Sequence, residues 1–361
     1  MAKKVVSLFS GGGGLDLGFK AAGYNIIWAI DNEKNAVNTY KANIGKNIIC
    51  ADINTIDVNK IPRADVVIGG PPCQSFSLAG NRRTNDARGQ LIWKYIHIIE
   101  KVHPKAFLFE NVVGLLSAKT GKGEKVIELL QAMFRKIGYT ITTKIVNAAD
   151  YGVPQRRRRV IIVGLRNGTE FIFPKETHNE LGKGLKKYVS AKDALSDLPK
   201  ATINENELLC YDRRPRTEYQ RKMRSPKGVT EHFVFQTSLL DKYIISHVKP
   251  GGNYMDIPSS VKSKRIQRLQ KNGGHTTCYG RLSPDKPSYT INTYFNRPNV
   301  GCNIHYSEDR LITVREALRL QSFPDSYTIV SSSKHGRNLI VGNAVPPLLA
   351  NVLACQLKKY L

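Results

Sequence analysis

A cysteine that follows a short apolar run is the first residue in this chain placed to act as a nucleophile. Cys73 lies in the stretch Gly69-Gly70-Pro71-Pro72-Cys73-Gln74, directly after the run Asp65-Val66-Val67-Ile68. Such a run predicts a buried strand, and open α/β sheets keep their ligand and catalytic groups at the carboxyl ends of strands. A cysteine in apolar surroundings is more often inert, because a thiolate needs a positive charge or a helix terminus nearby. The charged residues elsewhere in the chain therefore decide whether Cys73 is reactive.

Two further segments supply a carboxylate and fixed positive charge. Glu110 follows the apolar run Ala106-Phe107-Leu108-Phe109, so we expect it at the same sheet edge as Cys73. Four consecutive arginines, residues 156–159, lead into the run Val160-Ile161-Ile162-Val163. Because side chains alternate along a strand, Arg157 and Arg159 are expected to share one side. A thiol, a carboxylate and arginines at one edge would suit covalent catalysis assisted by a general acid or base.

A glycine-rich loop near the start of the chain is typical of a nucleotide-like ligand site. Gly11-Gly12-Gly13-Gly14 follows the first apolar run and opens a helix. The dinucleotide pattern G-x-G-x-x-G fails, because Asp16 stands where the third glycine is required, and no phosphate-binding lysine motif is present. Asp31 ends the second apolar run, where a carboxylate can accept hydrogen bonds from ribose hydroxyls. The loop argues against NAD and ATP and fits another adenosine cofactor.

The elements that must position these residues alternate between apolar runs and helical stretches over the first 180 residues. This alternation predicts an α/β fold with a mostly parallel sheet flanked by helices. The expected strands are residues 5–9, 26–30, 66–68, 106–109, 139–146 and 160–163. A second domain is expected from about residue 180, and dense Gly and Pro between 225 and 310 predict short strands and loops there. Helical pattern returns at 314–321 and 347–358.

Composition and charge exclude several classes of protein. The chain has 361 residues with 41% hydrophobic and 23% charged residues, which fits two globular domains and not a disordered, collagen-like or coiled-coil protein. No apolar run approaches 18 residues and no signal peptide is evident, so we expect a cytoplasmic protein without a membrane segment. The six cysteines show no metal-ligand or disulfide spacing, so no metal is expected. A net charge of +26 predicts a polyanionic partner, with nucleic acid favoured over membrane.

Taken in order, these segments resemble the DNA (cytosine-5)-methyltransferases of bacterial restriction–modification systems over nearly the whole chain. Each fragment is weak alone, but seven in the family's order are specific. They are the cofactor loop Phe9-Ser10-Gly11-Gly12-Gly13-Gly14, Pro71-Pro72-Cys73-Gln74, Asp86-Ala87-Arg88-Gly89-Gln90-Leu91, Glu110-Asn111-Val112, Gln155-Arg156-Arg157-Arg158-Arg159, Arg310 with residues 315–324 (REALRLQSFP), and Gly342-Asn343-Ala344-Val345-Pro346-Pro347.

The resemblance implies a covalent mechanism on a flipped-out cytosine, with S-adenosyl-L-methionine as the methyl donor. Cys73 would add to carbon 6 and so activate carbon 5. Glu110 would contact ring nitrogen 3 and the exocyclic amine, while Arg159 would hold the carbonyl oxygen of the base. Arg157 would support the cysteine loop or the phosphates. Because a stacked base is out of reach, the target must leave the duplex.

The resemblance also implies a cofactor pocket on the Rossmann-like fold of S-adenosylmethionine-dependent methyltransferases. Phe9 and Leu91 would flank the adenine, Asp31 would hold the ribose, Asp52 and Ile53 would lie near the adenine amino group and ring, and Asn343 with Ala344 would complete the pocket near the methionine part. The expected cofactor-binding residues are Phe9, Gly11, Gly13, Gly14, Leu15, Asp31, Asn32, Asp52, Ile53, Gly70, Pro72, Leu91, Asn343 and Ala344.

The resemblance further predicts a discontinuous catalytic domain, residues 1–180 and 340–361, around a smaller, irregular, strand-rich target-recognition domain, residues 181–339. Residues 181–310 carry 23 Lys and Arg against 12 Asp and Glu, a net of +11, which suits the gripping of DNA phosphates. The last helix should return to pack on the first domain. The expected DNA-binding residues are Gln74, Ser77 and Arg88 in the family's active-site loop, then Lys262, Lys264, Arg265, Arg268, His275, Tyr279 and Arg281 in the recognition domain.

The partner implied is double-stranded DNA, bound by a monomer, with a cognate restriction endonuclease as a functional partner only. Two alternatives stay open at this point. A transfer-RNA cytosine-5 methyltransferase would share Pro-Pro-Cys and Glu-Asn-Val, although the long basic region favours duplex DNA. A catalytically inactive DNA-binding regulator would not need Cys73, Glu110 and Arg159 together. The recognition sequence cannot be deduced from these residues.

Overall fold

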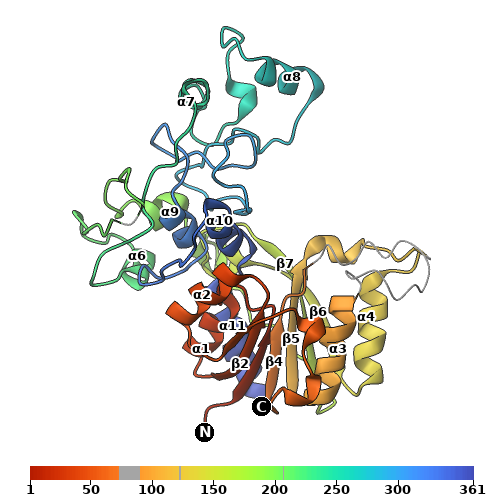
Figure 1. Cartoon of the computed structure of the whole chain (residues 1–361). Coiled ribbons are helices and arrows are strands. Elements are labelled where there is room, and N and C mark those ends of the chain that lie inside the picture. The colour runs from red at the N-terminus through yellow and green to blue at the C-terminus, as the bar shows by residue number, and fades with distance from the viewer. Residues whose placement is uncertain (73–89, 122, 206) are drawn as a thin grey trace. The chain divides into compact units, whose positions relative to one another are not determined.

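The computed structural model describes residues 1–72, 90–121, 123–205 and 207–361, which divide into two compact units (Figure 1). The first unit comprises Met1–Asn147, Arg158–Lys175 and Leu349–Leu361, and the second comprises Ala148–Arg157 and Glu176–Leu348. The first unit therefore contains both ends of the chain. This division rests on compactness and assigns no function to either unit. The catalytic and target-recognition domains, with boundaries near 180 and 339, therefore stay predictions.

The first unit is built on a seven-stranded sheet of order β3-β2-β1-β4-β5-β7-β6. All neighbouring strands are parallel except that β7 runs antiparallel to β5 and β6. The α/β fold with a mostly parallel sheet is thereby confirmed. The strands are β1 (Lys4–Leu8), β2 (Asn25–Asp31), β3 (Ile48–Cys50), β4 (Val66–Gly69), β5 (Ala106–Val112), β6 (Thr140–Asn147) and β7 (Arg158–Leu165).

Helices cover both faces of this sheet, as Figure 1 shows. On one face α3 (Gln90–Val102) and α4 (Val126–Lys136) pack in a cluster that includes Tyr95, Phe109 and Phe134. On the other face α1 (Gly14–Ala21) and α2 (Lys34–Asn43) cover β2 and β3, where Val37 and Tyr40 are buried. Burial on both faces explains why β4 and the start of β5 read as continuous apolar runs.

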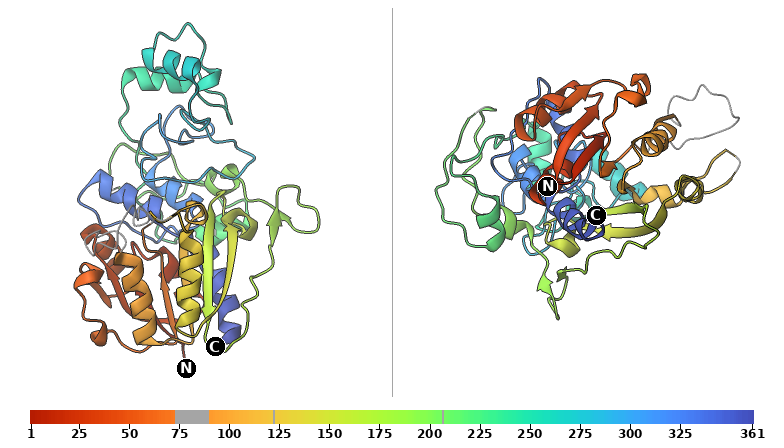
Figure 2. Two further views of the ribbon diagram at one scale, coloured as in Figure 1. Left: turned by 90° about the vertical axis from the view of Figure 1, so that its right-hand side faces the viewer. Right: turned by 90° about the horizontal axis from the view of Figure 1, so that it is seen from below.

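The last helix of the chain, α11 (Pro347–Leu357), belongs to the first unit from Leu349 onward. The Tyr24 hydroxyl donates to the Ala354 carbonyl at 3.1 Å, and the Asn351 amide donates to the Gly18 carbonyl at 3.2 Å. The chain ends meet, because Nζ of Lys3 donates to the Leu361 carbonyl at 2.6 Å, and Figure 2 shows both termini at the base of this unit. The last helix therefore packs on the first unit, as expected from the sequence.

Residues 334–360 include a helical stretch that is long and apolar enough to cross a membrane by length and composition alone. Its most apolar 18-residue window is 61% buried inside the protein, which is how a core helix behaves. The stretch consists of α10 (Lys334–Asn343), α11 and a final 3-10 turn, and Pro346 lies in the break between the two helices. This one segment is weak evidence for a membrane span.

The second unit is irregular, as predicted, but the prediction that it is strand-rich is wrong. Among its described residues the only paired strands are β8 (His178–Asn179) and β9 (Lys186–Lys187). Proline and glycine interrupt the chain too often for ladders to extend, since proline lacks the donor that a ladder needs. Short helices stand in their place: α5 (Ala191–Leu195), α6 (Glu218–Met223), α7 (Leu239–Ser246), α8 (Lys264–Asn272), α9 (Val314–Leu320) and α10.

Buried ion pairs around α9 hold the second unit together. Thr313 caps the helix in a reciprocal capping box with Glu316. Glu316 also receives two hydrogen bonds from the Arg310 guanidinium, both at 2.8 Å. Arg319 is fully buried and forms ion pairs with Asp197 at 2.9 Å and with Asp325. Arg310 and residues 315–324, one of the seven family-like segments of the sequence, are therefore held in place by satisfied buried charges.

Candidate active site

The candidate active site lies where β4 and β5 end in the first unit. Nε of Arg159 lies 2.8 Å from Oε1 of Glu110, and both side chains are only 11% exposed. In the antiparallel ladder of β5 and β7, Arg159 is opposite Val112, so Glu110 and Arg159 are diagonal neighbours on one face of the sheet. A nearly buried carboxylate with a fixed cation is an arrangement that can hold a polar ring and move a proton to or from it.

The segment that leads into Pro71-Pro72-Cys73 is positioned by β5. The Asn111 side-chain amide donates to the Pro71 carbonyl at 2.9 Å, and the Asn111 amide oxygen accepts from the Val112 N–H at 2.9 Å. A Cβ atom on Gly70 would lie 2.8 Å from Oε2 of Glu110, so only glycine leaves this carboxylate its place. Cys73, Gln74, Ser77 and Arg88 lie outside the described residues, and their predicted roles stay predictions.

The glycine-rich loop is fixed by Asp31 at the end of β2. The N–H groups of Gly11 and Glu33 donate to the two carboxylate oxygens of Asp31 at 2.8 and 2.9 Å. Burial raises the pKa of Asp31, while these backbone hydrogen bonds act in the opposite direction. Gly13 has φ +86°, and a Cβ atom there would lie 2.6 Å from Cγ1 of Ile44, so this position requires glycine.

A small cavity opens beside this loop at the carboxyl ends of β1 and β2. It is lined by Phe9, Ile30, Asp31, Asn32, Ala51, Asp52, Ile53, Pro72 and Leu91. Seven of the expected cofactor residues therefore lie together: Phe9, Asp31, Asn32, Asp52, Ile53, Pro72 and Leu91. Two lining residues, Ile30 and Ala51, were not predicted from the sequence. They directly precede the predicted residues Asp31 and Asp52, and this position in the sequence could have indicated them.

The residues of this cavity fit the adenosine part of a cofactor. Phe9, Ile53 and Leu91 supply apolar walls for a flat ring. Each oxygen of the Asp31 carboxylate accepts one backbone hydrogen bond, which leaves lone pairs for ribose hydroxyls. A Cβ atom on Gly11 would contact nothing within 4 Å, so the space above the loop is open to a ligand.

The remaining cofactor predictions are placed around the loop or in the second unit. Gly13, Gly14 and Leu15 are buried at the start of α1, and Gly70 lies beneath Glu110. Asn343 is exposed at the end of α10 and Ala344 follows it in extended conformation, both within the second unit. Their contribution to a cofactor pocket stays a prediction.

Below the loop lies a buried carboxyl group that the sequence reasoning did not assign. Asp16 is fully buried, and its Oδ1 accepts a hydrogen bond from the Tyr40 hydroxyl at 2.9 Å. Burial raises the pKa of Asp16 to about 6, against opposing hydrogen bonds from Ser7 and Tyr40. No sequence pattern distinguishes this carboxyl group from an exposed first-turn aspartate.

The prediction that Arg157 shares a strand face with Arg159 is wrong. β7 begins at Arg158, so Arg157 precedes the strand and the alternation of side chains does not reach it. Its guanidinium is buried in the second unit and donates to the carbonyls of Ile291 at 3.1 Å and Gly342 at 2.9 Å. Arg157 is thereby a positioning residue for the segment that leads to Asn343, and its support of the cysteine loop or of DNA phosphates stays a prediction.

Five of the expected DNA contacts in the second unit are exposed, and two are not. Lys262, Lys264, Arg265, Arg268 and His275 are exposed on or beside α8. Tyr279 and Arg281 are 0% and 4% exposed, and we correct the expectation that they contact DNA.

Internal partners explain the burial of these two side chains. The Tyr279 hydroxyl lies 2.9 Å from the Arg265 guanidinium and 3.2 Å from Asp241. Arg281 donates to the carbonyls of Ile245, His305 and Glu308 and to the Asp309 carboxylate. Among the described residues no group of three or more His, Cys, Asp or Glu is arranged to hold a metal ion.

The sequence is similar to those of known DNA methylases over nearly its whole length. The family model of the C-5 cytosine-specific DNA methylases matches residues 3–359. The Type II methyltransferase M.NgoFVII of Neisseria gonorrhoeae is 37% identical over 95% of this chain and 83% of its own length. The Type II methyltransferase M1.HphI of Haemophilus parahaemolyticus is 34% identical over 98% of this chain and 86% of its own.

Solved structures share the fold. A prophage-encoded E. coli protein, named as a DNA modification methyltransferase, covers 99% of both chains with a TM-score of 0.73 and 23% identity. The Dnmt2 methyltransferase of S. pombe covers 99% of both chains with a TM-score of 0.61 and 19% identity. Because the family model spans nearly the whole chain and the sequence relatives exceed 30% identity, the chain belongs to the C-5 cytosine-specific DNA methylase family and is a DNA (cytosine-5)-methyltransferase of the Type II restriction–modification kind.

Proposed function

We propose that the protein methylates carbon 5 of one cytosine within a specific short sequence of double-stranded DNA, with S-adenosyl-L-methionine as cofactor. In the cytoplasm this modification would protect host DNA from a cognate restriction endonuclease, which is a functional and not a physical partner of a monomeric enzyme. The observation that carries the proposal is the ion pair between Glu110 and Arg159 at 2.8 Å. Glu110 is on β5, which adjoins the strand that leads to Cys73, and Arg159 is on β7, the next strand beyond β5.

The proposed chemistry begins with Cys73. Its thiolate forms a bond to carbon 6 of the cytosine, which turns carbon 5 into an enamine-like nucleophile. The cofactor, when bound, would supply an electrophilic methyl group and would leave as the neutral thioether S-adenosylhomocysteine. Carbon 5 then carries both the methyl group and its original proton. Loss of that proton to a solvent base and cleavage of the bond between carbon 6 and sulfur restore the aromatic ring and the Cys73 thiolate.

Glu110 and Arg159 are proposed to make the first step possible. Addition of the thiolate places negative charge on the ring, and a proton held between Glu110 and ring nitrogen 3 neutralises it. Arg159 fixes the Glu110 carboxylate through Nε, and its Nη1 donates to the Arg158 carbonyl at 2.8 Å. Its other guanidinium N–H groups are proposed to donate to the carbonyl oxygen of the base. The Asn111 amide holds the Pro71 carbonyl and so positions the start of the loop that carries the nucleophile.

The target cytosine must leave the duplex to reach these groups. Unstacking and unpairing cost a few kcal/mol, which contacts to the flipped base and to the DNA backbone must offset. Exposed basic residues of the second unit, including Lys262, Lys264 and Arg268 near α8, are proposed to supply part of those contacts. Most such contacts go to phosphates, so these residues set affinity before they set sequence preference.

Methyl transfer to duplex DNA tests this function. Purified protein incubated with methyl-labelled S-adenosylmethionine should label double-stranded DNA and leave transfer RNA unlabelled. Bisulfite sequencing of a plasmid from an expressing host should show one protected cytosine within a recurring short sequence. Label in transfer RNA alone would favour a transfer-RNA methyltransferase, and binding to DNA without any methyl transfer would favour a regulator.

A further inference from the structure

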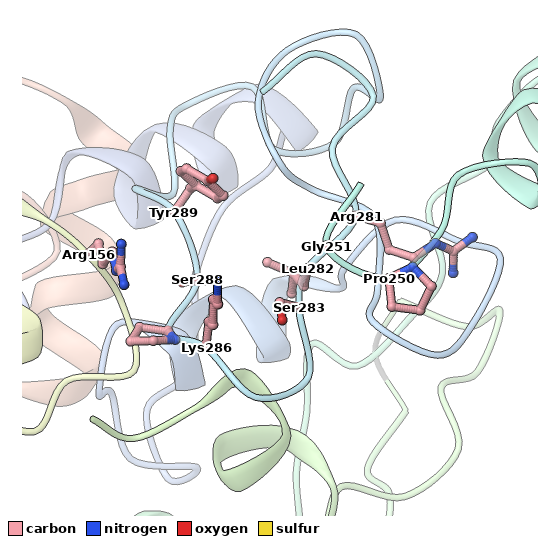
Figure 3. Close-up of a pocket in the computed structure, with 10 residues that line it drawn as sticks. Arg156, Pro250, Gly251, Arg281, Leu282, Ser283, Lys286, Ser288 and Tyr289 are labelled. Carbon is pink, nitrogen blue, oxygen red and sulfur yellow. The ribbon is translucent and has the colours of Figure 1, made fainter. Parts of the chain in front are cut away.

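A cavity of the second unit is lined by none of the residues of α8 and by none of the residues placed in the candidate active site. Its volume is about 350 Å³, and its lining residues come from three segments: Arg156, then Pro250-Gly251, then residues 281–283 with 286–289. Figure 3 shows Arg156 and Tyr289 on one side, Pro250 and Arg281 on the other, and Ser283 and Ser288 between them. All ten lining residues belong to the second unit.

Backbone hydrogen bonds hold the three segments in place. The Arg156 N–H donates to the Ser288 carbonyl at 2.8 Å, and the Ser288 N–H donates to the Pro154 carbonyl at 3.0 Å. On the opposite side the Gly251 N–H donates to the Leu282 carbonyl at 3.3 Å, and the Arg281 N–H donates to the Gly252 carbonyl at 3.0 Å. The cavity is therefore preformed, and only side-chain head groups need to move when it is filled.

The charge of the cavity is positive. Arg156 and Lys286 are exposed cations, Ser283 and Tyr289 add hydroxyl groups, and none of the ten lining residues is acidic. Arg281 contributes no free charge, because its guanidinium is buried and ion-paired with Asp309 at 2.6 Å. Two cations and two hydroxyls around a preformed hollow are donors that match the oxygens of a phosphate group.

Arg156 already holds an anion at the edge of this cavity. Its Nη2 lies 2.6 Å from Oε1 of Glu180, and the two side chains are 42% and 60% exposed. An ion pair this exposed contributes little to stability, because water screens it and side-chain entropy opposes it. A phosphate can therefore take the place of the Glu180 carboxylate on the Arg156 guanidinium at small cost.

We propose that this cavity receives a backbone phosphodiester of the bound duplex, and that Arg156 exchanges Glu180 for that phosphate. Lys286 supplies the second positive charge, and the Tyr289 and Ser283 hydroxyls donate to the remaining oxygens. The inference rests on the proposed function, since it names where duplex DNA is gripped. Glu180 then acts as an internal competitor that lowers non-specific affinity for DNA.

The test measures binding of a duplex substrate at several salt concentrations, by fluorescence anisotropy, for full-length variants. Each phosphate contact contributes about 0.9 to the slope of log affinity against log salt. Arg156→Gln and Lys286→Gln should each lower affinity about three- to tenfold at moderate salt and should each reduce the slope, by about 0.9 in total because both cations act on one phosphate. Arg135→Gln is the matched control, because Arg135 is exposed at the end of α4, at the sheet edge opposite the active site. It should leave the slope unchanged.

The exchange of partners is tested with Glu180→Gln, which should tighten DNA binding about two- to fivefold in the same assay. The control is Glu218→Gln, since Glu218 forms a similarly exposed ion pair with Lys186 at 3.0 Å in the same unit and carries the same charge. Thermal unfolding checks that the second unit of each variant is folded, and cofactor binding by calorimetry checks the first unit, which holds the cofactor cavity. Equal effects of Glu180→Gln and Glu218→Gln would overturn the exchange.

The remaining outcomes separate this inference from the proposed function. Wild-type slopes retained in both Arg156→Gln and Lys286→Gln, in a protein that still methylates DNA, would overturn the phosphate cavity and leave the function standing. A second outcome is that inorganic phosphate binds the wild type at micromolar concentration and does not bind Arg156→Gln, while the DNA slopes are unchanged. This result would assign the cavity to a free anion and would also overturn the proposed phosphodiester site. A wild type that neither binds nor methylates duplex DNA would overturn both.

Discussion

Nε of Arg159 lies 2.8 Å from Oε1 of Glu110, across the antiparallel ladder between β5 and β7. The pair brings together two segments that are almost fifty residues apart in sequence and fixes a carboxylate that is 11% exposed. We therefore expect that this pair determines the rate of methyl transfer and contributes little to cofactor binding, because neither residue lines the cofactor cavity.

Glu110→Gln should slow methyl transfer about 10²- to 10⁴-fold, the range that a positioned acid or base supplies. Arg159→Lys keeps the charge but loses the fixed guanidinium geometry, so a smaller loss of turnover is expected. Steady-state kinetics and calorimetric cofactor binding check both, with the exposed neighbour Arg158→Lys as the control. Full turnover in Glu110→Gln would remove the carboxylate from the mechanism.

Gly70→Ala should lower kcat and leave the free energy of unfolding almost unchanged. The added Cβ atom would lie 2.8 Å from Oε2 of Glu110, which is closer than two such atoms can approach, so the carboxylate must turn away from its place. The control is Gly45→Ala, since a Cβ atom there meets nothing within 4 Å. Equal activity of the two alanine variants would show that the position of this oxygen does not matter.

Asp16 should make the stability of the protein depend on pH between about 4 and 7. Its pKa in the folded state is about 6, above the ordinary value of 3.8, because burial disfavours the charged form. The folded state therefore binds this proton more tightly than the unfolded state does. The stability that Asp16 contributes is present below pH 4 and is lost as pH rises through 6, by about 3 kcal/mol.

Asp16→Asn, which cannot ionise, should remove this dependence. As pH rises from 5 to 7.5, the free energy of unfolding of the wild type should fall relative to that of Asp16→Asn. Denaturant unfolding at each pH measures it. Parallel curves for the two proteins would mean that the Asp16 pKa is ordinary in the folded state.

Glu316→Gln should destabilise the second unit by about 3–5 kcal/mol, because it removes the only buried carboxylate that pairs with the Arg310 guanidinium among the described residues and leaves it the half-exposed Glu308 alone. The neighbouring pair of Arg310 with Glu308 is a built-in comparison, since the Glu308 side chain is 47% exposed. Glu308→Gln should cost no more than about 1 kcal/mol. Thermal unfolding of both variants is the measurement, and equal losses would contradict the account.

Much of the first unit could be predicted because its strands are buried on both faces. β1 and β4 show as apolar runs for that reason. β3 (Ile48–Cys50) was missed because it is short and two of its three residues are exposed. α10 was missed because its sequence, KHGRNLIVGN, carries charged and polar residues among few apolar ones.

The second unit resisted prediction because its structure depends on contacts between distant segments. An arginine such as Arg281 looks like a DNA contact in the sequence, but its acceptors come from residues 245, 305, 308 and 309. Arg157 was placed on a strand that begins one residue later. Asp31 could be placed at the cofactor cavity from its position at the end of an apolar run, whereas Phe9, Asp52, Ile53 and Leu91 were expected there only from the resemblance to the family.

The most direct test of the central claim is a covalent trap. A duplex with 5-fluorocytosine at the target position blocks the last step, since fluorine cannot leave as the carbon-5 proton does. With S-adenosylmethionine present, the wild-type protein should form an adduct with this duplex that survives denaturation, and Cys73→Ser should form none. An adduct that persists in Cys73→Ser would contradict the assignment of the nucleophile, and absence of an adduct with active wild-type protein would contradict the covalent mechanism.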